Sequence, residues 1–215
     1  MKIAILCSDE NHPVIPHLQE WMARQKSDHE VCSYSRKADL LPADLLFLIS
    51  CQEMIGPELR RQYRSVLVLH ASALPAGRGW SPHIWQVIEG SNRLTVTLLE
   101  ADDPVDSGAI WATREFVLQG HELYDEINAA LFQTELDLMD WAVANFDGFV
   151  PIPQSDAGIS HYPRRRPVDS QLDPQRSIAD PFDQLRVADP DRYPAFFDLR
   201  GCRYRVMLEK ENKDD

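Results

Sequence analysis

Residues 65–111 read SVLVLHASALPAGRGWSPHIWQVIEGSNRLTVTLLEADDPVDSGAIW, and this stretch decides the fold class of the chain. Its residues 66–69 are valines and leucines, which predicts a short buried strand that ends at His70. A loop with glycine and proline and a helix over 81–89 follow, and a second apolar strand over 94–100 leads to Asp106. A histidine and an aspartate that each follow a buried strand predict a polar site in the crevice of an α/β sheet.

The same alternation of strands and helices extends over the first two thirds of the chain. Alternating strands and helices are typical of a mostly parallel sheet with helices on both faces. We therefore predict an α/β fold, with strands over 2–7, 31–35, 45–50, 65–70, 94–100 and 109–118, and helices over 15–24, 57–63, 81–89 and 122–146.

The C-terminal third has a different character. Residues 148–174 are rich in proline and arginine and show little periodicity, which indicates an ordered arm. A helix over 177–188 and a β-hairpin over 195–208, turning at Arg200-Gly201, are expected after it. We predict two units, an α/β domain over 1–148 and a small arm, helix and hairpin over 149–215, whose last seven charged residues are expected to fray.

Composition limits the function classes. The formal net charge of −12 disfavours binding to nucleic acid, because an acidic surface repels phosphates. The four cysteines form neither a CxxC pair nor a cluster with histidines at zinc spacing, so no metal site is expected. Free thiols, a first apolar run too short for a signal peptide, and the absence of a membrane-spanning run predict a cytoplasmic protein without membrane partners.

Two motifs in the central stretch resemble those of the folate-dependent formyltransferase family. The sequence VLHASALP at 68–75 is similar to the family motif NIHPSLLP, and VDSG at 105–108 is similar to LDTG. The histidine, serine, leucine and proline match, whereas Val68 replaces the family's asparagine. The resemblance implies a formyltransferase-type sheet and transfer of a formyl group from 10-formyltetrahydrofolate, the co-substrate, to an amine.

In that reaction the resemblance implies catalytic roles for His70 and Asp106. His70 would stabilise the oxyanion of the tetrahedral intermediate and move protons, and Asp106 would orient His70. The alternative is a core histidine with a satisfied hydrogen bond and an aspartate in a turn. The matching flanks HxSxLP and DSG favour the catalytic explanation.

Val68 is the main departure from the family. Residues two apart on a strand share a face, so Val68 is expected on the side of His70, and valine donates no hydrogen bond. Another donor could replace the asparagine, with Gln52, Ser72 or a backbone N–H as candidates. Otherwise His70 and Asp106 suffice alone, or the protein binds its ligands without catalysing.

The segment SCQEMIGP at 50–57 corresponds in position to the loop that grips the pterin in the family. Ordinary core packing explains its apolar residues equally well. The residues implied in contact with the folate, in this loop and in the segment just before Asp106, are Gln52, Met54, Ile55, Ala101, Asp102 and Asp103.

The arm points to the acceptor. YPRRRPVDS at 162–170 and RYPAFF at 192–197 resemble motifs of sugar formyltransferases, closest to those of the pseudaminic acid type. The resemblance implies a nucleotide-linked, UDP-type 4-amino-4,6-dideoxy sugar as substrate and partner. The candidate ligands of this substrate are Asn11, His12, Arg78, Arg164, Arg165 and Arg166. Two of them have an ordinary structural explanation as well: His12 as part of a turn before a helix, and Arg78 as a solvated loop arginine.

Two other functions stay open at this point. A hydrolase with the same site would release formate from the folate, and a non-catalytic relative would bind folate or nucleotide sugar only. A homodimer is expected from the resemblance alone.

Overall fold

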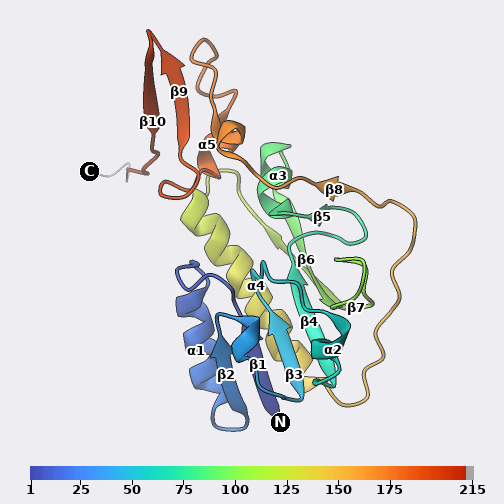
Figure 1. Ribbon diagram of the computed structural model, residues 1–215. Helices are drawn as coiled ribbons and strands as arrows, with labels where there is room; N and C mark the ends of the chain where they lie inside the picture. The colour runs from blue at the N-terminus through green and yellow to red at the C-terminus, as the bar shows by residue number, and fades with distance from the viewer. Residues whose placement is uncertain (212–215) are drawn as a thin grey trace.

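A six-stranded sheet forms the centre of the molecule in the computed structural model, which describes residues 1–211 (Figure 1). Its strand order is β2-β1-β3-β4-β6-β7. Strands β1 to β4 pair in parallel, whereas β6 is antiparallel to both of its neighbours, so five strands share one direction. The predicted mostly parallel α/β sheet is confirmed, with strands β1 Lys2–Leu6, β2 Glu30–Tyr34, β3 Leu45–Leu48, β4 Ser65–His70, β6 Arg93–Glu100 and β7 Ile110–Val117.

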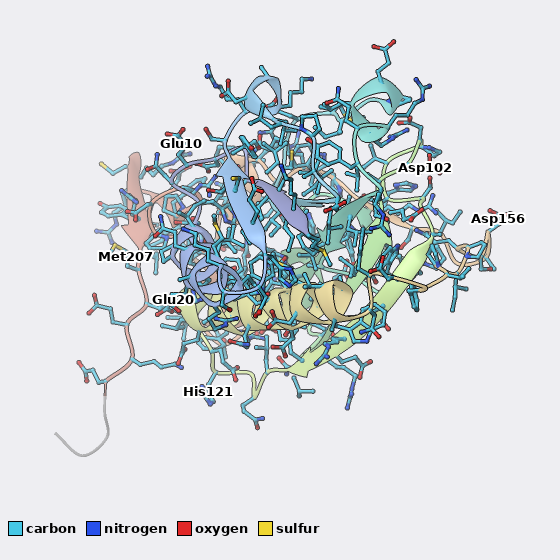
Figure 2. The ribbon with its side chains drawn as sticks, turned by 90° about the horizontal axis from the view of Figure 1, so that it is seen from below. Glu10, Glu20, Asp102, His121, Asp156 and Met207 are labelled. Carbon is cyan, nitrogen blue, oxygen red and sulfur yellow. The ribbon has the colours of Figure 1, made fainter. Side chains whose placement is uncertain are left out.

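The strand residues alternate between two apolar layers. On one face, α1 (Ile15–Gln25) and the long α4 (Tyr124–Ala144) pack against the sheet (Figure 2). Trp21 of α1 is fully buried in this layer. The other face is covered by α2 (Pro57–Arg60), the 3₁₀ turn Lys37–Asp39 and loops. Burial on both faces explains why the central strands read as continuous apolar runs.

Several helices are shorter than the sequence predicts. The third, α3, spans Pro82–Ile88 and agrees with the expected 81–89, but α2 ends at Arg60 rather than at 63. In the arm, α5 spans only Phe182–Arg186, against a prediction of 177–188. Pro181 explains this difference, because it has no N–H to continue a helix and occupies the position before the first turn.

The arm packs onto the sheet domain rather than standing apart. The residue after α5, Val187, is fully buried in an apolar cluster with Ile84 and Leu94. Next to it the Arg186 guanidinium, 1% exposed, donates to Asp183 and, over 2.7 Å, to Asn92. The predicted antiparallel hairpin is confirmed as β9 (Ala195–Leu199) and β10 (Cys202–Val206).

The end of the chain is only partly described. Lys210 pairs with Glu126 of α4, and residues 212–215, on which part of the fraying prediction falls, lie outside the described residues. None of the described helices is long and apolar enough to cross a membrane.

One acidic side chain lies inside the core. Glu135 of α4 is 6% exposed, and its Oε2 has no hydrogen-bond partner within the described residues. Burial raises the pKa of this carboxyl to about 8, since removing the proton would leave an unpaired charge in an apolar layer.

We predict that Glu135→Gln changes the pH dependence of stability. The folded pKa lies above the ordinary value of 4.5, so the folded state binds more protons between about pH 4.5 and 8. The wild-type free energy of unfolding therefore loses this contribution as pH rises through that window. Urea unfolding should find the variant more stable than wild type at pH 8, by on the order of 1–4 kcal/mol, with the gap closing toward pH 5.

The exposed Glu58 offers a matched control, and Glu58→Gln should leave the pH dependence unchanged. A Glu135→Gln difference that is constant from pH 5 to 8 would contradict the buried, protonated carboxyl.

Candidate active site

His70, the last residue of β4, is held by the loop that follows it. Its Nε2 lies 2.9 Å from the carbonyl oxygen of Gly77. A carbonyl only accepts hydrogen bonds, so Nε2 is the donor in this contact. The other ring nitrogen, Nδ1, faces Oδ1 of Asp106 at 3.6 Å, and the two side chains are 8% and 7% exposed. A nearly enclosed imidazole and carboxylate therefore face each other.

Asp106 reaches this position by a route that differs from a simple strand end. Strand β6 is antiparallel to β4, with Leu67 opposite Glu100 and His70 opposite Thr97. The carboxyl end of β6 thus lies about three residues away from His70 along β4, and the following loop has to turn back. The idea that the end of a strand delivers Asp106 is corrected here, because the returning loop delivers it.

The returning loop is tightly built. Gly108 passes so close to Glu100 that a Cβ on it would lie 1.9 Å from the Glu100 carbonyl oxygen, so only glycine fits. Asp106 itself has a φ of 61°, in the left-handed region. The backbone N–H of Gly79 donates to its Oδ2 over 2.9 Å, which leaves Oδ1 directed at His70.

Arg78 lies inside the protein rather than in an open loop. It is 9% exposed, and its Nη2 donates to Oε1 of Gln154 over 2.9 Å. The Gln154 amide nitrogen in turn donates to the carbonyls of Asp106 and Gly108, over 2.9 and 2.8 Å. The predicted acceptor ligand Arg78 therefore contacts the arm, and Gln154 links it to the loop that carries Asp106.

The arm also holds the loop that follows His70. Strand β8 (His161–Tyr162) pairs in parallel with β5 (Arg78–Gly79). Ser160 accepts from Gly77 through its Oγ, over 2.8 Å, and from Arg78 through its carbonyl, over 2.9 Å. The loop residues that touch His70 and Asp106 are thus fixed by a segment far along the chain.

Val68 lies on the side of β4 that faces α2 and packs in an apolar cluster with Ile55 and Ala101. Among the donors that could replace the family's asparagine, Ser72 is engaged, because its hydroxyl donates to the carbonyl of Ala76 over 2.8 Å. The Gln52 side chain is exposed and lies at the rim of a pocket of about 480 Å³.

The two predicted folate loops lie beside each other. Ile55 is 5% exposed and Met54 is 61% exposed, so these neighbours point to the core and to solvent respectively. The Arg60 guanidinium lies 2.6 Å from the carboxylate of Asp103 and 3.8 Å from that of Asp102. This pair of contacts ties α2 to the segment before Asp106.

Asn11 and His12, the acceptor ligands predicted after the first strand, lie in different surroundings. Asn11 lines the 480 Å³ pocket, together with Ser8, Asp9, Glu10, Gln52 and Glu53. His12 accepts the N–H of Val14 through Nδ1 over 3.2 Å, as expected for a turn before a helix. Burial and, secondarily, Arg192 lower the pKa of His12, which favours its neutral form.

The three consecutive arginines of the arm separate. The Arg164 guanidinium stacks on Trp80 at 4.7 Å, and Arg166 is exposed beside Asp169. Arg165 is 8% exposed and donates to the Ser170 hydroxyl over 2.9 Å, while its Nε has no partner within the described residues. Of these three, only Arg165 combines burial with an unused donor, a combination that the described residues also show at Arg78 and Arg186.

His83 of α3 is a site residue that sequence reasoning missed. Its buried Nδ1 has no partner in the part of the chain that the structure describes. Burial, helped by the nearby His70, His12 and Arg165, lowers the pKa of His83 to about 3. No sequence signal marks it, since it occupies an ordinary helical position.

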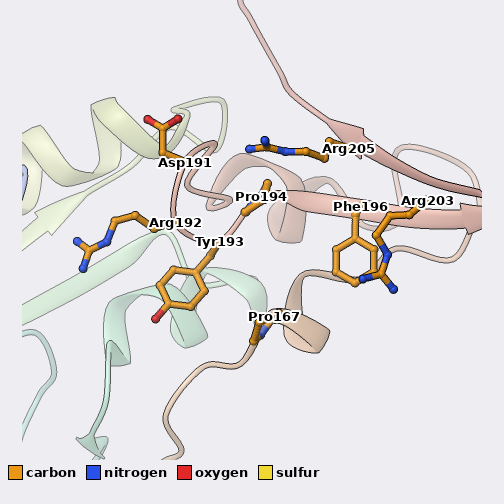
Figure 3. Close-up of a pocket in the computed structure, with 8 residues that line it drawn as sticks. All are labelled: Pro167, Asp191, Arg192, Tyr193, Pro194, Phe196, Arg203 and Arg205. Carbon is orange, nitrogen blue, oxygen red and sulfur yellow. The ribbon is translucent and has the colours of Figure 1, made fainter.

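A second pocket, of about 290 Å³, lies in the arm next to the hairpin (Figure 3). Arg203 stacks on Phe196 at 3.9 Å and pairs with Asp198, and Arg192 pairs with Asp9 over 2.8 Å. Arg192 begins the RYPAFF motif, whereas Arg203 and Arg205 carry no signal in the sequence. The pocket is lined by Pro167, Asp191, Arg192, Tyr193, Pro194, Phe196, Arg203 and Arg205.

The fold and the site define an α/β protein with an enclosed histidine–aspartate pair suited to acid–base chemistry. The family described as formyl transferase matches residues 1–143, and the chain belongs to this family.

The similar proteins include formyltransferases with different acceptors. The chain is 27% identical over 187 residues to the methionyl-tRNA formyltransferase of Synechococcus sp. (strain JA-3-3Ab), covering 86% of this chain and 56% of that protein. The chain thus spans about half the length of that curated relative.

Three solved structures show the same fold. A methionyl-tRNA formyltransferase from Clostridium thermocellum has a TM-score of 0.84 at 19% identity and covers 100% of this chain and 95% of its own. A 4-N formyltransferase from Francisella tularensis has a TM-score of 0.77 at 17% identity and covers 98% of both chains. HypX from Aquifex aeolicus, solved with tetrahydrofolic acid, has a TM-score of 0.79 at 21% identity and covers 97% of this chain and 37% of its own.

Proposed function

We propose that this protein transfers a formyl group from 10-formyltetrahydrofolate to the amine of a nucleotide-linked amino sugar, a UDP-linked 4-amino-4,6-dideoxy sugar. The observation that carries the proposal is the enclosed pair in which His70 Nδ1 faces Asp106 Oδ1 at 3.6 Å. Membership of the formyl transferase family supports formyl transfer as the reaction that takes place at this pair.

Both members of the pair have a role in the proton transfers. The acceptor amine attacks the formyl carbon, and the resulting tetrahedral intermediate carries an oxyanion and an ammonium. We assign to His70 Nδ1 the uptake of the ammonium proton. The imidazolium would then lie between two acceptors, the Gly77 carbonyl and the Asp106 carboxylate, and its charge would stabilise the oxyanion.

The second half of the reaction returns that proton. The bond between the formyl carbon and N10 of the folate breaks, and His70 passes the proton to N10 as tetrahydrofolate leaves. Asp106 keeps the ring oriented in both steps, because the Gly79 N–H fixes its carboxylate. The N-formyl sugar and tetrahydrofolate account for all atoms of the two substrates.

The folate donor is supplied as a substrate, and the residues at the carboxyl ends of β1 and β3 suit its pterin. The 480 Å³ pocket beside Gln52 offers amide and carboxylate acceptors for the ring's amino and N–H groups. Its carboxylates Asp9, Glu10 and Glu53 disfavour the anionic glutamate tail of a folate. We therefore assign the tail to the exposed side of the loop, near Met54.

Two classes of acceptor substrate have to be compared, a sugar nucleotide and methionyl-tRNA. Methionyl-tRNA is the second candidate, because the curated relative at 27% identity is a methionyl-tRNA formyltransferase. The net charge of −12 opposes a polyanionic tRNA. A single nucleotide needs only a few local cations, and the arm supplies Arg165 and the arginines of the 290 Å³ pocket. These observations support the sugar nucleotide.

An assay with purified protein and 10-formyltetrahydrofolate tests the proposal. Tetrahydrofolate release would be followed with a UDP-linked 4-amino-4,6-dideoxy sugar, its dTDP analogue, methionyl-tRNA, or no acceptor. We expect turnover with an amino sugar nucleotide and little without acceptor. Turnover with methionyl-tRNA alone would overturn the acceptor assignment, and acceptor-independent formate release would establish a hydrolase.

We predict that His70→Ala and Asp106→Asn each lower kcat/KM by on the order of 10³ or more, since each removes a part of the proton pathway. Circular dichroism and thermal melting should show an intact fold. The exposed His121 and Asp156 provide control variants, His121→Ala and Asp156→Asn, which should retain wild-type turnover. Near wild-type activity of both site variants would reject the catalytic assignment.

Val68→Asn separates a complete site from a degenerate one. Val68 packs against apolar neighbours, so the amide should cost about 1–3 kcal/mol of stability through unsatisfied hydrogen bonds. If another group supplies the oxyanion donor, we expect a less stable enzyme that is no faster. Side-by-side turnover with one amino sugar nucleotide provides the measurement, and a gain of about 10-fold or more would show that wild type lacks a donor.

A further inference from the structure

We propose that Gln154 is a positioning residue, whose side-chain amide sets the place of the turn that carries Asp106 and thereby the approach of Asp106 to His70. This inference rests on the proposed formyl transfer. Gln154 lies outside the family match at 1–143. It belongs to the segment that leaves α4 and runs up one side of the sheet to β8 (Figure 1).

The Gln154 amide uses all of its hydrogen-bonding groups at this place. Its two hydrogens go to the carbonyls of Asp106 and Gly108, over 2.9 and 2.8 Å, and its Oε1 accepts from Arg78 over 2.9 Å. Carbonyls only accept and a guanidinium only donates, so only one orientation of the amide satisfies the three contacts. The side chain therefore acts as a specific link rather than as a filler.

The Asp106 turn has hydrogen bonds of its own from Ser107 to the Pro104 carbonyl, and Gln154 adds a link to the rest of the chain. Residues 101–109 form a long reversal, and Asp106 sits at a φ of 61°, a left-handed conformation that is uncommon for non-glycine residues and that aspartate adopts more readily than most. Gln154 fixes the backbone on both sides of Ser107. With the backbone in place, the Asp106 carboxylate meets the Gly79 N–H and His70.

The segment around Gln154 is itself anchored at both ends. Two residues before it, Ile152 exchanges two backbone hydrogen bonds with Ile110, of 2.7 and 2.8 Å. Six residues after it, Ser160 binds Gly77 and Arg78. Figure 2 shows Asp156, between these anchors, at the same end of the molecule as Asp102. One strap over 152–162 thus contacts both loops of the site.

The carbonyls of Asp106 and Gly108 explain why the residue is glutamine and not glutamate, although Arg78 could pair with either. A glutamate at 154 would give this buried guanidinium a carboxylate partner and stabilise it electrostatically. It would also have no hydrogen to donate to the carbonyls of Asp106 and Gly108 and would place a negative charge against them. The two effects have opposite consequences for stability and for the position of Asp106, which makes Gln154→Glu a discriminating variant.

We expect Gln154→Glu to lower kcat by about 10–100-fold, the scale of a displacement of about 1 Å in an active site. Both KM values should stay within about 3-fold, because the residue is assigned no ligand contact, and the melting temperature should not fall. Independently of activity, ¹H–¹⁵N spectra of the histidine rings should show shifted His70 resonances, assigned by their loss in His70→Ala. Gln175→Glu, an exposed change of the same kind in the arm, should match wild type in every readout.

Unchanged kcat and unchanged His70 resonances in Gln154→Glu would overturn the proposal. Gln154→Met, of similar volume and without hydrogen bonds, guards against a folding defect. If both variants unfold, or if Gln154→Met matches wild type, the positioning role is also rejected. Should wild type transfer no formyl group to any acceptor, the proposed function fails, and the His70 spectra still decide whether Gln154 positions the pair.

Discussion

The antiparallel placement of β6 beside β4 constrains the whole site, because it sends the chain away from His70 just before Asp106 has to reach it. The loop after β6 must therefore reverse, and this reversal requires unusual backbone geometry at two positions. Gly108 passes the Glu100 carbonyl where no Cβ fits, and Asp106 adopts a positive φ. In return, the turn brings the carboxylate into a nearly enclosed contact with the imidazole that ends β4.

That constraint gives the arm a part in the site. The strap over 152–162 binds the loop after β4 through Ser160 and the reversal after β6 through Gln154. The end of α5 adds Val187 to an apolar cluster of the sheet domain, which fixes the arm at a second place. Changes in the arm are thus expected to reach the His70–Asp106 pair through the backbone carbonyls of the turn, without any contact with the reacting atoms.

The sequence allowed most strands and the central pair to be predicted, because both depend on local signals. Buried strands read as apolar runs, and His70 and Asp106 sit in short motifs. Contacts between distant segments had no such signal. Arg78 reads as a loop arginine, yet its partner lies 76 positions further on, at Gln154. The helix predicted over 177–188 was wrong for most of its length, because Pro181 lies at the position before the first turn and the helix begins only at Phe182.

The surroundings of two neighbouring histidines explain why we assign the proposed proton transfers to His70 alone. His70 and His83 lie close enough to influence each other's charge, but burial and neighbouring cations lower the pKa of His83 to about 3. An imidazole with that pKa does not hold a proton at neutral pH, so His83 adds no positive charge next to the pair. His70 differs in having two acceptors, the Gly77 carbonyl and the Asp106 carboxylate, for its two N–H groups when protonated. A neutral His83 therefore fits the proposed mechanism, because it adds no charge that would compete for Asp106 with an imidazolium at His70.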